Sequence, residues 1–323
     1  MKGKYRVVIQ TSRIKYDFMI RRNITVITGN SATGKTTLIE MIADYQLHGT
    51  ASGITLECDK HCEVLADTRW ELILSDIKDS IVFIDEESSF VKTKRFAELA
   101  RQSDNYYVIV SRERLAQLPY SVEEIYGIRE TGRYSGLRQT YNEMYQLYGN
   151  FLHGELAVAP ELVITEDTNA GYEFFSDICR VNKIECLTAG GKSNVCEIML
   201  KYSGERITLA IVDGAAFGAE MEKMMSEVNA RNNFFLYTPE SFEWLILQSS
   251  VLNHVPGHIL NHPEDYIASE NYFSWEQFFT HLLTELTRKH AGRYSKKKLN
   301  PFYLSDTNKR KILGNMHGIK FSH

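Results

Sequence analysis

The sequence predicts an α/β protein in two domains, built from strands that alternate with helices. Short apolar runs rich in β-branched residues recur along the chain, and patterns with helical spacing follow several of them. Residues 81–84 are apolar without interruption, as expected of a strand buried on both faces of a parallel sheet. A glycine-containing loop at residues 29–36 joins a β-branched run to a helical pattern. Together these observations indicate three-layer α/β architecture.

The first domain is predicted to cover residues 1–132. Its expected strands lie at residues 5–10, 15–20, 24–28, 53–56, 62–65, 80–84, 106–111 and 123–129. Strands 53–56 and 62–65 are expected to pair with each other. Helices are expected after the glycine-containing loop and at residues 70–77 and 92–102. Residues 133–154 are rich in Tyr, Gly and Asn and are predicted to be a linker.

A second α/β domain is predicted at residues 155–250. Its expected strands lie at residues 161–165, 184–187, 207–212 and 234–237. Its expected helices lie at residues 172–181, 194–201 and 217–229. The remaining residues, 251–323, are predicted to form a helical and basic C-terminal extension.

Composition is typical of a globular protein. The chain has 323 residues, of which 43% are hydrophobic and 24% are charged, and this length favours about two domains. No apolar run approaches the roughly 18 residues of a membrane span, so no membrane partner is expected. The five cysteines form no regular framework, and the first residues lack the apolar stretch of a signal peptide. A reducing, cytoplasmic location is therefore expected.

Charge is distributed unevenly along the chain. The net charge is −4, yet residues 288–323 contain ten Lys and Arg against one acid, which leaves +9 there and −13 elsewhere. A basic segment of this kind predicts contact with a polyanion. Tyr294, Phe302 and Tyr303 are interleaved with the basic residues, a pattern that suits phosphate contacts combined with base stacking. Nucleic acid is therefore the expected partner, with a merely solvated tail as the alternative.

Residues 29–36 match the phosphate-binding pattern GxxxxGK[ST] in full. The loop that would cradle a nucleotide consists of Gly29, Asn30, Ser31, Ala32, Thr33, Gly34, Lys35, Thr36 and Thr37. Glycines at both ends let backbone N–H groups turn towards phosphate oxygens, and the following helix directs its positive end at them. Lys35 would reach the β- and γ-phosphates, and the Thr36 hydroxyl would hold Mg²⁺.

An acidic pair follows the apolar strand 80–84. Asp85 and Glu86 stand at its carboxyl end, about fifty residues after Lys35. Because ligands of parallel α/β sheets lie beyond the carboxyl ends of the strands, this pair is expected beside the phosphate loop. Asp85 would position Mg²⁺, and Glu86 would act as general base towards water, with Glu87 as an alternative base.

Ser111 and Arg112 end the next predicted strand, where a polar residue would sense the γ-phosphate. Arg112 would contact phosphate, pair with Asp85, or be an ordinary surface arginine. Guanine specificity normally requires Asn-Lys-x-Asp after a strand, whereas the nearest string, at residues 182–185, follows a helix. ATP is therefore favoured over GTP. The first domain resembles P-loop ATPases, although it contains no ABC signature, and the resemblance implies ATP hydrolysis.

Three features of the second domain follow one another in order. Glu166 follows its first strand, a Gly-Gly-Lys turn at residues 190–192 follows the second, and Asp213 follows the third. Residues 239–245 then open a helix that carries an acid. In this order and spacing the domain resembles the TOPRIM fold of topoisomerases, primases and overcoming-lysogenization-defect nucleases. The resemblance implies a Mg²⁺-dependent nuclease in which Glu166 and Asp213 are catalytic metal ligands.

The sequence departs from this family at one position. Residues 213–215 read Asp-Gly-Ala where the family has Asp-x-Asp, so Ala215 removes a metal ligand. Either Glu220 or Glu243 would compensate, or the domain would bind without cutting. Carboxylates at neighbouring strand ends otherwise suit Mg²⁺, and Asp167 is a further candidate.

The architecture of the whole chain resembles that of overcoming-lysogenization-defect proteins and phage-defence ATPase–TOPRIM pairs. The resemblance implies an ATPase domain that controls a nucleic-acid-acting domain in defence against phages or mobile elements, acting as a homo-oligomer or with a protein partner. Two alternatives stay open. One is an ATP-dependent switch whose second domain does not cleave, and the other is a nucleotide or small-molecule kinase.

Two weaker metal patterns are present. Cys58, His61 and Cys62 form C-x₂-H-C but lack a fourth ligand at a spacing typical of zinc sites, so a strand turn is favoured. His254 and His258 recur at a spacing of four with a third histidine, but prolines beside them interrupt a regular helix.

Overall fold

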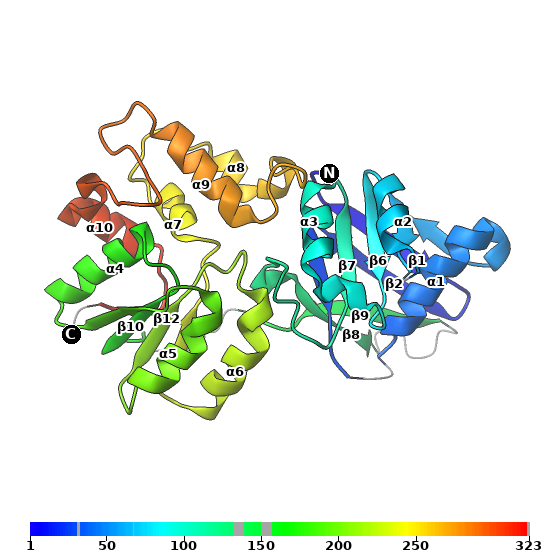
Figure 1. Cartoon of the computed structure of the whole chain (residues 1–323), viewed down its shortest axis with the longest axis horizontal. Helices are drawn as coiled ribbons and strands as arrows, with labels where there is room; N and C mark the ends of the chain where they lie inside the picture. Colours follow the sequence, from blue (N-terminus) through cyan, green and yellow to red (C-terminus); the bar gives the residue numbers. More distant parts are fainter. Residues whose placement is uncertain (31–32, 67, 132–138, 150–156, 322–323) are drawn as a thin grey trace. The chain divides into compact units, whose positions relative to one another are not determined.

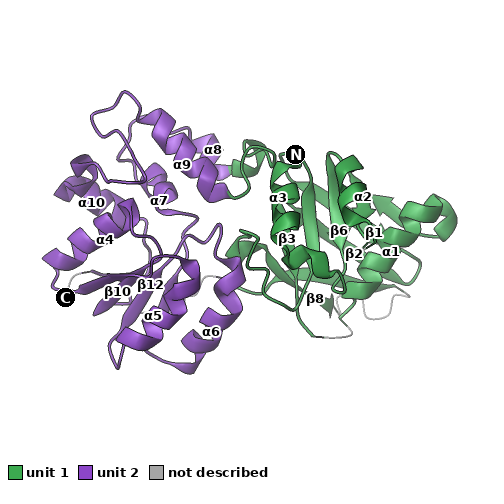
Figure 2. Ribbon diagram, in the orientation of Figure 1, with its two compact units in different colours: residues 1–148, 262–274 green, residues 149–261, 275–323 purple. Residues whose placement is uncertain are grey.

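The computed structural model describes residues 1–30, 33–66, 68–131, 139–149 and 157–321 of the chain (Figure 1). The chain divides into two compact units (Figure 2). Unit 1 contains residues 1–148 and 262–274, and unit 2 contains residues 149–261 and 275–323. The predicted C-terminal extension is therefore not a separate part, because its residues are divided between the two units.

Unit 1 is built on one mixed sheet. Among the described residues this sheet has nine strands, in the order β4-β1-β2-β9-β8-β3-β7-β6-β5. The strands are β1 (Tyr5–Gln10), β2 (Ile14–Ile20), β3 (Ile24–Ile27), β4 (Thr55–Glu57), β5 (His61–Val64), β6 (Ser80–Ile84), β7 (Tyr106–Val110), β8 (Ile125–Thr131) and β9 (Thr140–Gln146). Strands β8, β3, β7, β6 and β5 run parallel to one another, whereas β1 is antiparallel to both of its neighbours.

The two edges of this sheet are joined by only three residues. β4 and β5 stand at opposite ends of the strand order, yet only residues 58–60 separate them in the chain. A flat sheet of nine strands would be about 38 Å wide at roughly 4.8 Å per strand. Four steps between consecutive Cα atoms span at most about 15 Å. The sheet must therefore curl until its edges approach each other.

The curl corrects one prediction from the sequence. Residues 53–56 and 62–65 were expected to pair, but β4 pairs with β1 and β5 pairs with β6. The connection between β4 and β5 is short enough for a hairpin. The local sequence does not distinguish a hairpin from a connection that joins the two edges of one sheet. The pairing is decided by the helix that fills the space between the strands.

That helix is α1 (Lys35–His48), which begins at the end of the glycine-containing loop. It contacts β1 and β4 near one edge of the sheet and β5 at the other edge, so it lies inside the curl. Leu38, Ile39 and Ile42 of α1 are buried in one core with side chains of β1, β2, β3, β5, β6, β7 and β8. Near the end of α1, the side-chain carbonyl of Gln46 accepts a hydrogen bond of 2.9 Å from the backbone N–H of Val64 in β5.

Helices α2 (Trp70–Asp76) and α3 (Lys94–Gln102) cover the other face. Trp70 stacks on Phe90 with ring centroids 4.7 Å apart, and Phe96 meets the ring of Tyr107 edge-on at 5.5 Å. Tyr106 packs in the core around α1, so its neighbour Tyr107 points to the opposite face of β7. Helices therefore pack on both faces of the unit 1 sheet.

Strand β9 lies within the predicted linker 133–154. It pairs antiparallel with β8 over residues 126–131 and, at its start, parallel with β2. Its sequence, Thr-Tyr-Asn-Glu-Met-Tyr-Gln, contains polar residues suggestive of a loop, but Tyr and Thr also favour strands. Pairing with both β8 and β2 makes this segment a strand and not a loop. The rest of the predicted linker is described only at residues 139 and 147–149.

Residues 262–274, here called the docked segment, belong to unit 1 although the residues on either side belong to unit 2. The backbone N–H of Gly3 donates to the carbonyl of Glu264 at 2.6 Å, and the N–H of Ser269 donates to the carbonyl of Met1 at 2.7 Å. These backbone bonds attach the docked segment beside the start of β1.

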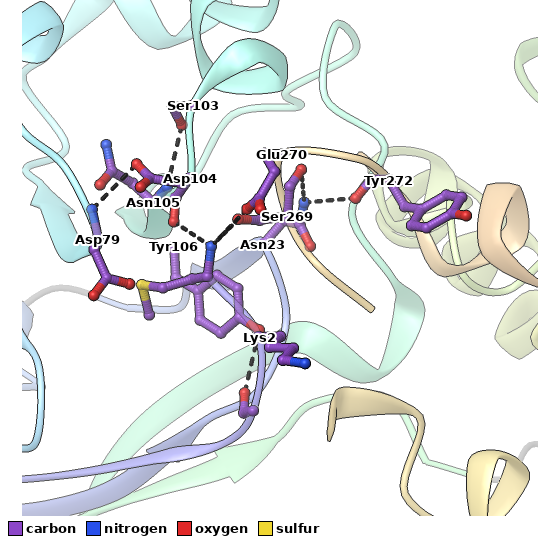
Figure 3. A network of polar contacts seen from close by, with 12 residues as sticks. Lys2, Asn23, Asp79, Ser103, Asp104, Asn105, Tyr106, Ser269, Glu270 and Tyr272 are labelled. Atoms are coloured by element: carbon purple, nitrogen blue, oxygen red, sulfur yellow. Dashed lines mark hydrogen bonds and ion pairs between the residues drawn. The ribbon is translucent and has the colours of Figure 1, made fainter. Parts of the chain in front are cut away.

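Asn23, directly before β3, is the main side-chain anchor of the docked segment (Figure 3). It is 5% exposed, and its amide donates to the carbonyls of Tyr272 at 2.9 Å and Ser269 at 3.3 Å. The guanidinium of Arg101 lies 5.3 Å from the ring centroid of Phe273. The docked segment is thus held by directional bonds at the base of the strand that leads to the phosphate loop.

Unit 2 contains a separate parallel sheet with the order β11-β10-β12-β13. Its strands are β10 (Leu162–Thr165), β11 (Glu185–Thr188), β12 (Thr208–Ile211) and β13 (Phe234–Tyr237). Its helices are α4 (Ala170–Val181), α5 (Val195–Tyr202), α6 (Met221–Ala230), α7 (Phe242–Gln248), α8 (Gly257–Asn261), α9 (Trp275–Leu286) and α10 (Asp306–Leu313). The strands β10 and β12 are central, so the residues after them emerge side by side.

These observations confirm the α/β class, as a nine-stranded mixed sheet and a separate four-stranded parallel sheet. Within the described ranges, none of the helices combines the length and the apolar character needed to span a bilayer.

Substituting Asn23 by Ala should loosen the docked segment. The change leaves the buried carbonyl of Ser269 and the partly buried carbonyl of Tyr272 without their amide donor, a loss that costs about 1–3 kcal/mol. We expect faster backbone amide exchange at residues 262–274, measured by hydrogen–deuterium exchange mass spectrometry. Asn271→Ala, which truncates an exposed side chain of the same segment, is the matched control. Equal exchange in the two variants would contradict the anchoring role of Asn23.

Candidate functional site

The phosphate-loop residues of unit 1 surround the ammonium group of Lys35. Lys35 is 4% exposed, and its Nζ donates to the carbonyls of Gly29 at 2.9 Å and Asn30 at 2.5 Å, and to Oγ1 of Thr33 at 3.1 Å. The ammonium group of Lys35 therefore holds residues of the loop together through its hydrogen bonds. Thr36 is exposed at the start of α1, and Thr37 is half-buried. Ser31 and Ala32, which the sequence also placed in the loop, lie outside the described residues.

Gly34 is required by the packing of the loop. It has φ of 91°, in the left-handed region, and a Cβ there would lie 2.7 Å from the hydroxyl oxygen of Tyr16. That hydroxyl donates to the carbonyl of Gly34 at 2.7 Å. The buried Tyr16 of β2 thus packs against the loop. Any side chain at position 34 would push the loop away from Tyr16.

The acidic pair occupies the carboxyl end of β6. One strand, β7, separates β6 from β3, so Asp85 and Glu86 emerge two strands away from the phosphate loop at the same edge of the sheet. Oδ1 of Asp85 accepts a hydrogen bond of 2.8 Å from the backbone N–H of Glu86. Asp85 is half-buried, whereas Glu86 and Glu87 are exposed.

The end of β7 contributes Arg112, which pairs with Glu86 and not with Asp85. Nε of Arg112 lies 2.8 Å from Oε1 of Glu86. Ser111, predicted to sense phosphate, is 6% exposed, and its hydroxyl contacts the backbone of Glu113 through hydrogen bonds of 3.0 and 3.1 Å. Ser111 therefore holds the turn that presents Arg112.

Electrostatics link these residues to Lys35. Burial lowers the pKa of Lys35, the positive charge of Arg112 lowers it further, and the carboxylate of Glu86 raises it. Lys35, Glu86 and Arg112 therefore act on one another across the carboxyl edge of the sheet.

In unit 2 the predicted residues Glu166 and Asp213 are direct neighbours. They follow the adjacent strands β10 and β12, and Oε2 of Glu166 accepts a hydrogen bond of 3.1 Å from the backbone N–H of Asp213. The Gly-Gly-Lys turn joins them, because the N–H of Gly191 donates to the carbonyl of Glu166 at 2.9 Å. Nζ of Lys192 is held by the carbonyl of Ala216 at 2.9 Å. The three motifs identified in the sequence therefore meet at one edge of the sheet.

Three residues that the sequence did not assign to this site join it. Glu276 of α9 forms an ion pair with Lys296, and the hydroxyl of Tyr294 donates to Oε1 of Glu243 at 2.7 Å. The carbonyl of Lys296 accepts from the N–H of Ala170 at the start of α4 at 3.1 Å. No spacing in the sequence connects Glu276, Tyr294 and Lys296 to Glu166, because they reach the sheet through helix packing.

Ala215 is packed in the interior of unit 2. Its position is not a vacancy left by the missing metal ligand. It is 2% exposed, and its N–H donates to the carbonyl of Glu240 at 3.2 Å. A Cβ at Gly214 would lie 2.7 Å from the carbonyl oxygen of Thr238, so the turn packs closely on the chain before α7. Of the two acids proposed to compensate for the missing ligand, Glu243 lines the same cavity as Asp213.

This cavity, here called the carboxylate cavity, is small. Its volume is about 20 Å³, which is room for roughly one water molecule. Its charged lining residues are Glu166, Asp167, Asp213, Glu243 and Lys296. Asp167 uses one oxygen, Oδ1, to accept the N–H of Tyr172 at 3.0 Å near the start of α4.

Burial dominates the electrostatics of the carboxylate cavity. It raises the pKa of Glu166 to about 7, against the hydrogen bond from Asp213. It also raises the pKa of Asp213 well above its ordinary value, and the charges of Glu276 and Glu166 add to this effect. Burial lowers the pKa of Lys296, but Glu243, Glu276 and Asp213 outweigh it and raise that pKa above its ordinary value.

The carboxylate oxygens have the chemistry that Mg²⁺ prefers. Their arrangement is less suited, because no group of three or more His, Cys, Asp or Glu side chains in the described ranges is placed to hold a metal ion. The ammonium of Lys296 instead supplies positive charge to the cavity. The same finding applies to Cys58, His61 and Cys62.

The basic tail is more tightly packed than its composition predicted. Tyr294 and Tyr303 are 2% and 0% exposed, so neither is available to stack on a base. Nζ of Lys309 lies 2.8 Å from Asp177, and Lys296 is paired as described. Buried aromatic residues and paired lysines are needed here to fix the tail against α4, α7 and α9, a role that composition does not distinguish from binding. Other tail residues are exposed, namely Arg288, Lys289, Arg293, Lys297, Lys298, Arg310, Lys311 and Lys320.

Comparison with known proteins adds no further constraint: no protein-family model and no curated protein matches this chain.

Removing the Glu166 carboxyl should change how stability depends on pH. Because the pKa of Glu166 is raised from 4.5 to about 7, the folded state binds more protons than the unfolded state in that window. Its contribution to stability is therefore lost as the pH rises from 4.5 to about 7. We expect Glu166→Gln to flatten this decline in the unfolding midpoint, measured by thermal denaturation across that range.

Asp213, whose pKa is also raised, should supply part of the decline that remains in Glu166→Gln. Glu205→Gln removes an exposed carboxylate from unit 2 and serves as the control. A wild-type midpoint that rises with pH over this window would contradict the assignment.

Proposed function

We propose that unit 1 binds and hydrolyses ATP in the presence of Mg²⁺. The observation that carries this proposal is the convergence of Lys35, Glu86 and Arg112 beyond the carboxyl ends of β3, β6 and β7. Each residue type has a role in phosphoryl transfer, since lysine and arginine stabilise phosphate charge and a glutamate orients the attacking water.

The residues of the loop support the proposal. Gly29, Gly34 and the backbone between them would receive phosphate oxygens, and the ammonium of Lys35 would move from the loop carbonyls to the phosphates. Thr36 and Asp85 are the residues that would hold Mg²⁺, which would neutralise charge on the β- and γ-phosphates. Glu86 is exposed, so it is accessible to the water that it would orient.

Substitutions of Lys35 and Glu86 should separate binding from hydrolysis. Lys35→Ala should abolish ATP binding, because it removes the buried cation of the loop. Glu86→Gln should preserve ATP binding and reduce turnover by about a hundredfold or more, since it removes the general base. Fluorescent nucleotide titration and phosphate release measure the two steps.

Lys94→Ala, at an exposed lysine at the start of α3, is the control for charge alone. Full turnover in Lys35→Ala would refute the phosphate-loop assignment. Unchanged turnover in Glu86→Gln would transfer the role of base to Glu87 or another group. Release of ADP that depends on an added acceptor would instead favour the kinase alternative.

For unit 2 we propose an action on the phosphodiester backbone of nucleic acid. The observation that favours it is the meeting of Glu166 and Asp213 in one cavity with Glu243 and Lys296, of which Lys296 is paired with Glu276. Glu166 and Asp213 would offer carboxylate oxygens to a cation, but the described residues place no third ligand beside them, so the proposal assigns no step to a metal ion. The small volume of the carboxylate cavity means that it must open before a phosphodiester enters. A switch that binds nucleic acid without cutting it is the alternative.

We further propose that ATP in unit 1 controls unit 2, in the manner implied by the resemblance to phage-defence ATPase–TOPRIM proteins. The connection of the chain from the docked segment of unit 1 into unit 2 supports this proposal. The docked segment is anchored through Asn23 directly before β3, and it ends at Ser274, two residues before Glu276, the ion-pair partner of Lys296 in the carboxylate cavity. A change in docking would therefore act on Glu276 through the backbone.

Cleavage assays with supercoiled plasmid and with RNA test the action of unit 2. We expect cleavage by the full chain with Mg²⁺ or Mn²⁺, dependence on ATP, and loss of cleavage in Glu166→Ala because the cavity loses a carboxylate. Glu205→Ala provides the control for an exposed acid of the same unit. Absence of cleavage under every condition, together with retained nucleic-acid binding, would favour the non-cleaving switch.

A further inference from the structure

The short connection between β4 and β5 is bordered by two cysteines that turn towards the same residue. Sγ of Cys58 accepts a hydrogen bond from the backbone N–H of Lys60 at 3.5 Å, and Sγ of Cys62 donates to the carbonyl of Lys60 at 3.8 Å. The backbone of Lys60 thus draws both sulfur atoms to one turn. Because only residues 59–61 separate the two cysteines, a bond between them would close a small ring.

Both cysteines line a cavity on unit 1. Its volume is about 390 Å³, far more than the roughly 10–15 Å³ that one water molecule needs, so small solutes fit in it. Cys58 is half-buried, whereas Cys62 is 8% exposed and belongs to the core around α1. A small neutral reagent in the cavity therefore meets the sulfur of Cys58 more readily than that of Cys62.

The surroundings of Cys58 favour its thiolate. The side chain of Cys62 is the largest influence on the pKa of Cys58, and it lowers that pKa. Backbone N–H groups of Lys60 and Asp59 also lower it, against burial and the carboxylate of Asp59, and the resulting pKa is about 7. Interaction with Cys58 and burial raise the pKa of Cys62. Since the thiolate is the nucleophilic form of cysteine, Cys58 is the more reactive of the two.

The ammonium group of Lys60 is engaged away from the two sulfur atoms. It forms an ion pair with Asp79, and its Nζ lies 5.4 Å from the ring centroid of Tyr5. The reactivity of Cys58 is therefore assigned to its contacts with the Cys62 side chain and the Lys60 backbone. Other titratable groups that face Cys58 or the cavity are Tyr5 of β1, Tyr45 of α1, and His61 and Glu63 of β5.

We propose that Cys58 and Cys62 form a reversible modification site that is oxidised by hydroperoxides such as hydrogen peroxide. The thiolate of Cys58 attacks one peroxide oxygen and becomes a sulfenic acid. The O–O bond breaks, and the other oxygen leaves as hydroxide, which takes up the proton that Cys58 released.

The second step closes the ring. The sulfur of Cys62 attacks the sulfenic sulfur, the S–O bond breaks, and the oxygen leaves as water with the proton of Cys62. The two sulfur atoms lose two electrons and the peroxide gains them. A dithiol reductant reverses the change by thiol–disulfide exchange. The disulfide would tie the connection on which the curl of the unit 1 sheet depends.

The first test treats the full chain with hydrogen peroxide, blocks the remaining thiols and measures masses before and after digestion with trypsin. We expect a product lighter by two hydrogen atoms, whose original mass returns with a dithiol reductant. Trypsin cleaves after Lys60, so a bond between Cys58 and Cys62 appears as two joined peptides. Oxidation that leaves these two cysteines unbonded would overturn the proposal.

Cys186→Ser is the matched control for this test. It removes a half-buried thiol from unit 2, and the joined peptides should form as in the wild type. Loss of the joined peptides in this variant would show that the bond between Cys58 and Cys62 arises by exchange with Cys186 and not by the steps proposed.

A second test assigns the roles of the two thiols. In Cys62→Ser no disulfide can close, so peroxide should leave Cys58 as a sulfenic acid that a cyclic dione traps. In Cys58→Ser, trapping at Cys62 should be about tenfold slower or more, since that thiol is covered and its pKa is raised. Equal rates of trapping in the two variants would refute Cys58 as the site of attack.

A third test measures the alkylation of Cys58 by iodoacetamide as a function of pH. In the wild type the rate should rise with an apparent pKa of about 7, because the thiolate forms above it. Cys62→Ala removes the neighbouring thiol and should shift the profile to higher pH, whereas Cys62→Ser retains a hydroxyl donor and should shift it less. An unchanged profile in Cys62→Ala would show that the two side chains do not interact and would overturn the proposal.

Discussion

The short connection between the opposite edges of the unit 1 sheet is the constraint on which that unit depends. Three residues, 58–60, join β4 to β5, so the nine-stranded sheet must curl. The concave face of a curled sheet must then be packed with apolar side chains. Helix α1 provides Leu38, Ile39 and Ile42 for this packing. Because α1 begins at Lys35, the packing that stabilises the curl also fixes the orientation of the phosphate loop. Core stability and loop geometry are therefore inseparable in unit 1.

The two candidate sites have opposite electrostatic character. In unit 1, the buried ammonium of Lys35 is held by loop carbonyls, and its pKa is lowered by burial and by the charge of Arg112. In unit 2, burial brings several carboxylates together and raises the pKa of Glu166 to about 7. Lys296 offsets part of their repulsion. The proposed polyphosphate would therefore meet positive charge at the first site, whereas the second site favours protonated carboxyl groups.

The docked segment gives the chain a path between the two sites. It is bonded to Asn23, next to the strand that carries the phosphate loop, and it leads within two residues to Glu276. Directional bonds hold this segment, and it also buries Ile267 and Phe273, which are 1% and 2% exposed. Control of unit 2 through the segment would require these contacts to open locally.

The sequence by itself determined the elements and the motifs. The strand predicted at residues 5–10 is β1, the loop at 29–36 joins β3 to α1, and Glu166 and Asp213 meet after neighbouring strands as their order implied. Local periodicity and turn chemistry act over a few residues, so they are readable from the chain. Tertiary structure alone decided that β4 and β5 lie at opposite edges, that β9 joins the sheet, and that Tyr294 is buried beside Glu243. It also decided that Lys296 lines the carboxylate cavity and pairs with Glu276, and that Arg112 pairs with Glu86 and not Asp85. These contacts join residues distant in the chain, and their free energy arises from burial and charge that exist only after the elements have packed.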